Sequence, residues 1–217
     1  MKIVLYGATG RAGSRILTEL LGRGHQVLAV VRNPDTLAPN DGLTVQQGDL
    51  SSVEAIAEAI GGAQAVISAY GPPPDKTEQL LGVTKREIAA VQQVSQQASS
   101  TEHAPRLIVV GGAGSLEVAP GVTLESAKDF PAAWKPIAQA HEKALELLRA
   151  SSIDWTYLSP SAFFEPGPRT GKFRLGQDTL LTDANGKSWI SMEDYAIALV
   201  DELEQPQHRR QRFTVGY

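Results

Sequence analysis

The sequence of 217 residues predicts an α/β fold built on a doubly wound parallel sheet. Apolar runs without polar alternation recur along the first two-thirds of the chain, which is typical of strands buried on both faces. Helical segments separate these runs, and strands that alternate with crossover helices place helices on both faces of a parallel sheet. A third observation is a glycine-rich turn that directly follows the first apolar run.

That first run, Lys2–Tyr6, continues through the turn into an amphipathic helix predicted over 11–23. Gly7 permits a tight turn off the strand, Gly10 has no Cβ to block a pyrophosphate, and Gly13 lets the helix pack closely on the sheet. The helix start then offers free N–H groups to phosphates. This pattern indicates a dinucleotide-binding loop rather than a merely structural strand–helix turn. The predicted cofactor contacts in the loop are Gly7, Thr9, Gly10, Arg11, Ala12 and Gly13.

The remaining elements follow from the same periodicities. Further strands are predicted at 26–31, 43–47, 64–68, 106–110 and 154–158. Further helices are predicted from a capping box of Ser51 and Glu54 to Ile60, over 77–97, over 137–150, and from 192 to 203 after a Ser191 cap. A strand at 212–216 ends the chain.

The pattern changes after Ser159, where prolines and glycines punctuate short apolar pieces. Short strands are expected at 172–175 and 179–181. We interpret 159–190 as a small substrate lid on the edge of the same domain, so that residues 1–217 form one domain.

Composition excludes several classes of function. The chain has no cysteine and four histidines, which argues against a disulfide framework, a thiol nucleophile or a metal site. A net charge of −4 without a dense Lys/Arg stripe argues against nucleic acid or an anionic membrane as partner. We expect a cytoplasmic protein, because the N-terminal apolar run is too short for a signal sequence or a membrane span. A monomer or homodimer is expected.

Ligands of open α/β sheets bind beyond the carboxyl ends of the strands. Arg32 follows the second strand, where a guanidinium suits the 2′-phosphate of NADPH; the alternative is an ordinary surface arginine. Asp49 and Leu50 follow the third strand and are suited to the adenine edge, or Asp49 merely caps the next helix. Further predicted cofactor contacts are Ser68, Ala69, Tyr70 and Gly71 after the fourth strand and Gly111 after the fifth.

Together, the segments 7–13, 31–32, 48–50, 111–115 and 158–163 resemble the atypical short-chain dehydrogenase/reductases. The resemblance spans nearly the whole chain and is to the NAD(P)H-binding, NmrA-like group commonly labelled NADH-flavin reductases. It extends more distantly to the NADPH-dependent biliverdin and flavin reductase. It implies a Rossmann-type domain and a bound nicotinamide dinucleotide.

The chain departs from the wider superfamily at the catalytic positions. Carbonyl-reducing members use a Tyr followed four residues later by Lys, and this sequence has no such pair. Trp134 and Ala138 occupy the corresponding places, and the serine after the fifth strand is missing unless Ser115 replaces it. The remaining catalytic candidates are Lys135, His141 and Ser115, although a polar His on an exposed helix turn is the simpler interpretation of His141.

These departures favour hydride transfer to an acceptor that needs little acid–base help. We therefore predict an NADPH-dependent oxidoreductase acting on a planar flavin- or quinone-like acceptor. Trp134, Phe163 and Phe164 are the candidate substrate wall. Tyr70, Phe130 and Trp189 are further aromatic candidates for the same slot; the alternative is that these aromatic residues pack into a small core. The principal alternative is a non-catalytic NADP(H) redox sensor that signals to a protein partner. An epimerase or dehydratase is a third, but these enzymes normally need the missing tyrosine.

Overall fold

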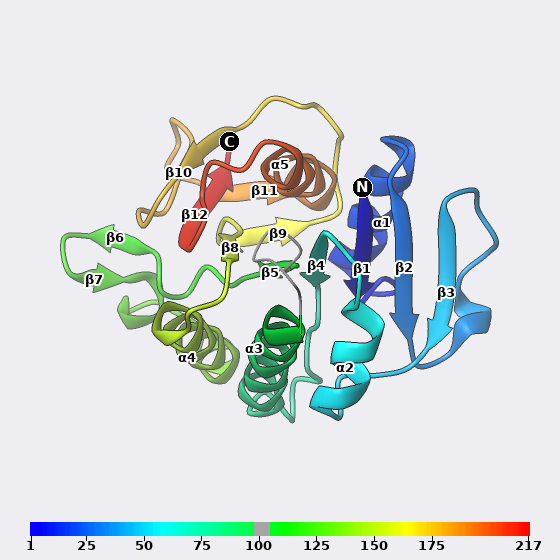
Figure 1. Cartoon of the computed structure of the whole chain (residues 1–217). Helices are drawn as coiled ribbons and strands as arrows, with labels where there is room; N and C mark the ends of the chain where they lie inside the picture. Colours follow the sequence, from blue (N-terminus) through cyan, green and yellow to red (C-terminus); the bar gives the residue numbers. More distant parts are fainter. Residues whose placement is uncertain (98–104) are drawn as a thin grey trace.

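The computed structural model describes residues 1–97 and 105–217, and its central feature is an eight-stranded sheet (Figure 1). The strand order is β10-β12-β8-β5-β4-β1-β2-β3, and β10 alone runs antiparallel to its neighbour. The strands are β1 (Lys2–Tyr6), β2 (Gln26–Val31), β3 (Leu43–Gln47), β4 (Ala65–Ser68), β5 (Arg106–Val110), β8 (Trp155–Ser159), β10 (Arg174–Gly176) and β12 (Gln211–Gly216). The predicted doubly wound parallel sheet of the Rossmann type is confirmed.

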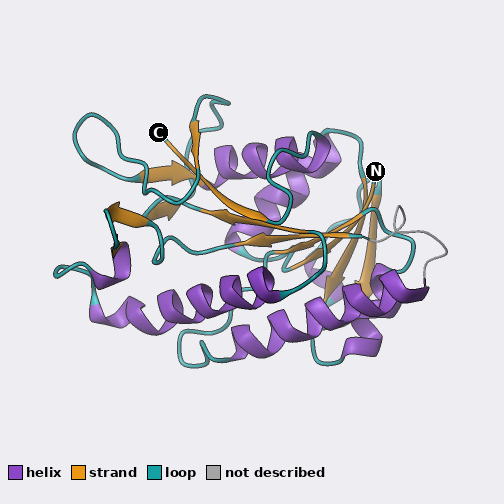
Figure 2. Ribbon diagram, turned by 60° about the vertical axis from the view of Figure 1, so that its left-hand side comes forward, coloured by secondary structure: helices purple, strands orange, loops and turns teal. Residues whose placement is uncertain are grey.

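Helices cover both faces of this sheet, which Figure 2 shows nearly edge-on. The helices are α1 (Arg11–Gly22), α2 (Val53–Ile60), α3 (Gln79–Gln97), α4 (Lys135–Ala150) and α5 (Met192–Glu204), and short 3₁₀ turns lie at Pro34–Thr36, Leu124–Ser126 and Ala132–Trp134. Helices α1 and α5 pack over Ile3 and Leu5, whereas α2, α3 and α4 pack over Val4 and Tyr6. Successive strand side chains point to opposite faces, so β1 contributes to both cores.

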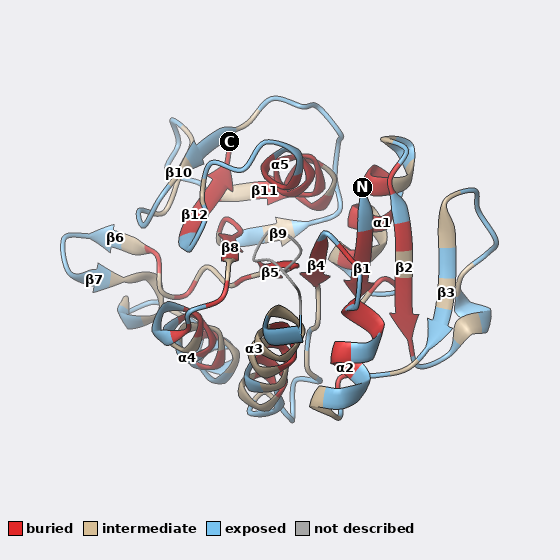
Figure 3. Ribbon diagram, viewed as in Figure 1, coloured by how far each residue is buried: buried red, intermediate tan, exposed pale blue. Residues whose placement is uncertain are grey.

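The central strands are the most deeply buried part of the molecule (Figure 3). The chain proceeds from β1 outward through β2 and β3, and then returns to β4 on the other side of β1. Loops that leave β1 and β4 therefore diverge in opposite directions. The carboxyl ends of β1 and β4 form the topological switch point at which open α/β sheets bind ligands.

Some local predictions are wrong. Helix α2 begins after Ser52, whose side chain accepts a hydrogen bond from Ala55 N at 3.1 Å, so the cap is Ser52 and not Ser51. The N–H of Ser51 instead donates to Asp49. The strand expected at 179–181 is reduced to a single bridge between Glu117 and Thr179.

Four short strands were missed by the periodicity argument. Strands β6 (Glu117–Ala119) and β7 (Val122–Thr123) form an antiparallel hairpin, while β9 (Phe163–Glu165) pairs in parallel with β11 (Trp189–Ser191). Each has only two or three residues, too few to show an alternation in the sequence.

The segment 159–190 is tied to the helices on the α1/α5 face. Arg169 donates to Glu19 of α1 at 3.0 and 3.1 Å, and Asp194 of α5 accepts from the backbone of Thr170 and Gly171. Strand β10 of the same segment extends the main sheet. The role of 159–190 as a substrate lid stays a prediction.

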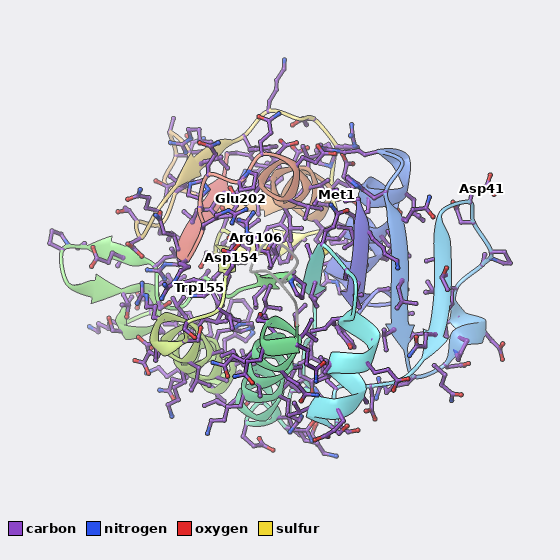
Figure 4. The ribbon with its side chains drawn as sticks, viewed as in Figure 1. Met1, Asp41, Arg106, Asp154, Trp155 and Glu202 are labelled. Carbon is purple, nitrogen blue, oxygen red and sulfur yellow. The ribbon has the colours of Figure 1, made fainter. Side chains whose placement is uncertain are left out.

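An ion pair is buried at the opposite, amino-terminal end of the strands. Arg106 of β5 pairs with Glu202 of α5 and also donates to Thr156, and neither charged side chain is more than 6 % exposed. Figure 4 shows Arg106 and Glu202 close together near Asp154 and Trp155. Because both charges are buried, removing one partner would leave the other unpaired.

Within the described ranges, no helix is both long and apolar enough to cross a membrane. The cytoplasmic location stays a prediction.

The two glycines of α1 provide a matched test of the fold. A Cβ at Gly13 would lie 1.9 Å from the carbonyl oxygen of Gly7, whereas a Cβ at Gly22 would meet nothing within 4 Å. Gly13→Ala should therefore cost about 1–3 kcal/mol, or roughly 3–10 °C in Tm, through overpacking. Gly22→Ala should be neutral or stabilising by up to about 1 kcal/mol, because alanine favours helix. Thermal unfolding followed by circular dichroism measures both, and equal Tm values would contradict the close packing at Gly13.

Candidate functional site

The loop between β1 and α1 is held by close backbone contacts. Gly7 has a φ of +80°, and a Cβ there would lie 2.3 Å from the carbonyl oxygen of Ala69 after β4. The N–H of Gly10 donates to the carbonyl of Gly7 at 2.9 Å. The left-handed backbone and the lack of space both require glycine at position 7.

Helix α1 begins at this loop with its first turn open to a ligand. Gly10 is the residue before the helix, and no side chain there caps the first backbone N–H groups. The first turn also carries no acidic residue. Unpaired N–H groups and the positive end of the helix dipole therefore suit an anion at this position.

A cavity of about 830 Å³ opens beside the loop at the carboxyl ends of β1 to β4. Nine of the predicted cofactor residues line it: Gly7, Thr9, Gly10, Arg32, Asp49, Leu50, Ala69, Tyr70 and Gly71. Its other lining residues are Tyr6, Val30, Val31, Gly48, Ser51, Pro72, Pro73, Lys76, Gln79, Gly82, Val83 and Arg86. Its volume and its position at the switch point fit a nucleotide-sized ligand.

The charged side chains that line the cavity are mainly cationic. Arg32, Lys76 and Arg86 contribute positive charge, and Asp49 is the acidic group among the lining residues. A hydrogen bond with Ser51, helped by the nearby guanidinium of Arg86, lowers the pKa of Asp49. The excess of cations favours a polyanionic ligand.

Two cationic residues of the lining were not predicted from the sequence. Lys76 lies in the turn before α3, and Arg86 lies within α3. The Nε of Arg86 donates to the carbonyl of Leu50 at 2.6 Å. A Cβ at Gly82 would make only ordinary contact with the Arg86 guanidinium, at 3.4 Å. No local sequence signal identified Lys76 or Arg86.

Five predicted cofactor residues lie outside the cavity lining: Arg11, Ala12, Gly13, Ser68 and Gly111. Gly13 serves the close approach of α1 to the loop, as its position in the motif suggested. At Gly111, a Cβ would lie 2.2 Å from the ring of Tyr157, so this glycine makes room for a buried aromatic side chain of β8.

The three catalytic candidates lie in different environments. Ser115 accepts a hydrogen bond from Arg212 at 2.8 Å and lines a second cavity of about 420 Å³. Lys135 is exposed at the first turn of α4. His141 is half-buried, with its Nδ1 3.1 Å from the hydroxyl of Tyr157. None of the three lines the larger cavity.

Hydrogen bonds and burial restrict the chemistry available at His141. The hydroxyl of Tyr157 accepts from Gly112 N at 3.0 Å and donates to the carbonyl of His141 at 3.1 Å. Burial lowers the pKa of His141 to about 4 and raises the pKa of Tyr157 above its usual range. Near neutral pH the imidazole is uncharged and the phenol is protonated.

The predicted aromatic wall is divided among three places. Trp134 is 51 % exposed and packs edge-on against Phe130 at 6.5 Å. Phe163 of β9 is 48 % exposed and lies opposite Trp189 in the β9–β11 pair. Phe164 instead points inward, with its ring 4.6 Å from that of Tyr195. Trp134 and Phe163 thus remain accessible, whereas Phe164 packs against the core.

Tyr6 at the cavity wall belongs to a small cluster of buried polar side chains. Tyr6 lines the cavity and is 2 % exposed, Glu87 of α3 is 2 % exposed, and Ser68 lies beside Tyr6 in the register of β1 and β4. Burial raises the pKa of Glu87 to about 7, although Ser68 and Arg86 favour its ionised form. Burial and the charge of Glu87 also raise the pKa of Tyr6.

Comparison with known proteins finds the same fold and a nucleotide-binding family. A family model described as NAD(P)H-binding matches residues 7–206. The uncharacterized protein YwnB of Bacillus subtilis is 41 % identical over 99 % of this chain and 98 % of its own length.

Two solved structures are also similar over the whole chain. One from Bacteroides thetaiotaomicron, described as a "putative epimerase", is 42 % identical with a TM-score of 0.88, covering 100 % of this chain and 96 % of its own. One from Streptococcus pneumoniae, described as a "putative NADH-flavin reductase", is 34 % identical with a TM-score of 0.86, covering 100 % and 99 %. The names of these two proteins imply different reactions.

Glu87→Gln should remove a pH dependence of stability. The folded-state pKa of about 7 is above the usual 4.5, so the stability that Glu87 contributes is present below pH 4.5 and lost as the pH rises toward 7. Between pH 5 and 7 the wild type should lose up to about 1.4 kcal/mol per pH unit relative to Glu87→Gln, and roughly 2 kcal/mol over the whole interval. Urea unfolding of both proteins at pH 5, 6, 7 and 8 measures the difference. Parallel pH profiles would contradict the protonation of buried Glu87.

Proposed function

We propose that this chain, which belongs to the NAD(P)H-binding family, is an NADPH-dependent reductase that transfers hydride to a planar flavin- or quinone-like acceptor. The family match supports a nicotinamide dinucleotide as the ligand of the larger cavity. The confirmed likeness to the atypical short-chain dehydrogenase/reductases supports redox chemistry.

The residues of the cavity fit a dinucleotide. Gly7 and Gly10 line the cavity, and the uncapped first turn of α1 offers N–H groups to a pyrophosphate. Asp49 keeps a low pKa and remains an acceptor for an adenine amino or ribose hydroxyl group. Tyr70, Pro72 and Pro73 continue the lining beyond β4, on the side assigned to the nicotinamide half.

The observation that carries the choice of NADPH is the placement of Arg32. Its side chain lines the cavity directly after β2, where NAD-specific folds usually place an acidic residue. A guanidinium suits bidentate bonding to the 2′-phosphate, and Lys76 and Arg86 add positive charge to the same cavity.

The class of acceptor follows from the shortage of proton donors. A bound nicotinamide supplies the hydride itself. Carbonyl reduction also needs an acid near the developing alkoxide, but His141 is neutral and the Tyr157 hydroxyl is held in two hydrogen bonds. Flavins and quinones can take their protons from water, so they need chiefly correct positioning. Exposed Trp134 and Phe163 are the residues we propose to contact such a ring.

One observation favours the alternative function, a redox sensor without turnover. The lining of the larger cavity comes from β1 to β4 and the start of α3, and includes no residue of 105–217. A protein that holds NADP(H) and reports it to a partner needs no acceptor site. The epimerase reaction suggested by the name of one similar structure would need a proton-transfer tyrosine, which this sequence lacks at the expected place.

Arg32→Ala should reduce the preference for NADPH over NADH. Loss of a charge-assisted bond of roughly 1.5–3 kcal/mol predicts a ten- to hundredfold weaker NADPH affinity with little change for NADH. Fluorescence titration with both cofactors measures the effect. Arg209→Ala is the matched control, because Arg209 is exposed and pairs with Asp154 away from the cavity. An unchanged preference in Arg32→Ala would remove the argument for NADPH.

Turnover with a panel of FMN, riboflavin, quinones and small aldehydes should separate the enzyme from the sensor. We expect NADPH oxidation with a flavin or quinone. Lys135→Ala should lower kcat by less than about tenfold, and Trp134→Ala or Phe163→Ala should lower it more, because ring positioning matters more than acid catalysis. A loss of about a thousandfold in Lys135→Ala would point to carbonyl chemistry instead. NADPH binding without turnover on any acceptor would support the sensor.

A further inference from the structure

Two buried polar atoms without a partner lie on the α3 side of β1, where Tyr6 lines the larger cavity. The hydroxyl of Tyr6 and the Oε1 of Glu87 accept or donate no hydrogen bond within residues 1–97 and 105–217. Tyr6 lines the cavity directly, and Glu87 lies one helical turn beyond Val83, which also lines it. Buried carboxyl groups normally have hydrogen-bond partners, so the unpartnered Oε1 of Glu87 beside Tyr6 indicates a role connected with ligand binding.

The groups around Glu87 do not strongly stabilise its ionised form. Tyr6 from β1 and Ser68 from β4 are its polar neighbours on the sheet. Arg86 of α3 attracts the ionised form, but its Nε donates to Leu50 instead. Asp49 and Glu78 add negative charge around Tyr6 and Tyr70, and Arg32 opposes them at Tyr70.

We infer that Glu87, which is buried beside the cavity-lining residue Tyr6, must be protonated for tight binding of a dinucleotide, so that binding takes up a proton from solvent. An ionised Glu87 would place a negative charge beneath a ligand with several phosphate charges. Since Glu87 is buried, solvent screens that repulsion weakly. Protonation removes the repulsion. The inference rests on the proposed dinucleotide site and adds a pH-dependent control of it.

The direction of the effect follows from linkage. In the free protein the pKa of Glu87 is about 7, and an anionic ligand above it raises that pKa further. Below about pH 6 the group is already neutral, so binding takes up no proton there. Between about pH 7 and 8.5 binding should take up as much as one proton, and affinity should fall by up to about tenfold per pH unit.

The test is calorimetric titration with NADP⁺ at pH 7.5 in two buffers with different heats of ionisation. The difference between buffers gives the number of protons exchanged, a quantity that a merely structural role for Glu87 would not change. At this pH the 2′-phosphate is already almost fully ionised. We expect net proton uptake in the wild type and a clear reduction in Glu87→Gln, which retains the shape but cannot titrate.

Tyr6→Phe is the control beside the carboxyl group, since it removes the hydroxyl and keeps Glu87. Proton uptake should persist in this variant, because the phenol is already protonated at pH 7.5. Equal uptake in the wild type and Glu87→Gln, or no uptake in a wild type that binds NADP⁺, would overturn the inference alone. A wild type that binds neither NADP⁺ nor NADPH would overturn the proposed function together with it.

Discussion

The contact of three backbone segments at the end of β1 is the constraint on which the site depends. Gly7 lies against the carbonyl of Ala69, and Gly13 lies against the carbonyl of Gly7. Neither position has space for a Cβ, so α1, the loop and the end of β4 occupy one tightly packed corner. That corner directs the first turn of α1 toward the cavity and brings the residues after β4 to its edge. A change in any of the three segments would shift the other two.

Side chains on the two faces of β1 pack against different helices, because successive side chains of a strand point to opposite faces. Ile3 and Leu5 belong to the apolar core under α1 and α5, where ion pairs such as Arg23 with Glu19 lie at the periphery. Val4 and Tyr6 face α2, α3 and α4, and the carboxyl group of Glu87 is buried on this face. The α1/α5 face therefore supports the fold and the 159–190 segment, whereas α3 contributes the charged side chain of Arg86 to the cavity.

Much of the fold could be predicted from the sequence, because long apolar runs and the glycine motif are local signals. The β1–α1 loop is the best case, since Gly7 and Gly13 each have a distinct steric reason. The contributions of α3 could not be read in the same way. Arg86 reaches the cavity because α3 packs on the face of β1 and β4, and Lys76 lies in the turn before that helix; no short sequence spacing records this contact. Gly111 is the opposite case. It follows β5, where a cofactor contact was predicted, but it makes room for the ring of Tyr157 and does not line the larger cavity.

The edge beyond β5 limits the reactions that the protein could support. Gly112 N, the Tyr157 hydroxyl and the His141 carbonyl form a closed set of hydrogen bonds, and a Cβ at Gly112 would lie 2.8 Å from the His141 ring. A proton donor drawn from this set would have to break a buried hydrogen bond at the moment of transfer, leaving a polar group unsatisfied. The acceptor that we propose takes its proton from solvent and avoids this cost. A carbonyl acceptor would need another donor at this edge, such as exposed Lys135 or a group of the substrate itself.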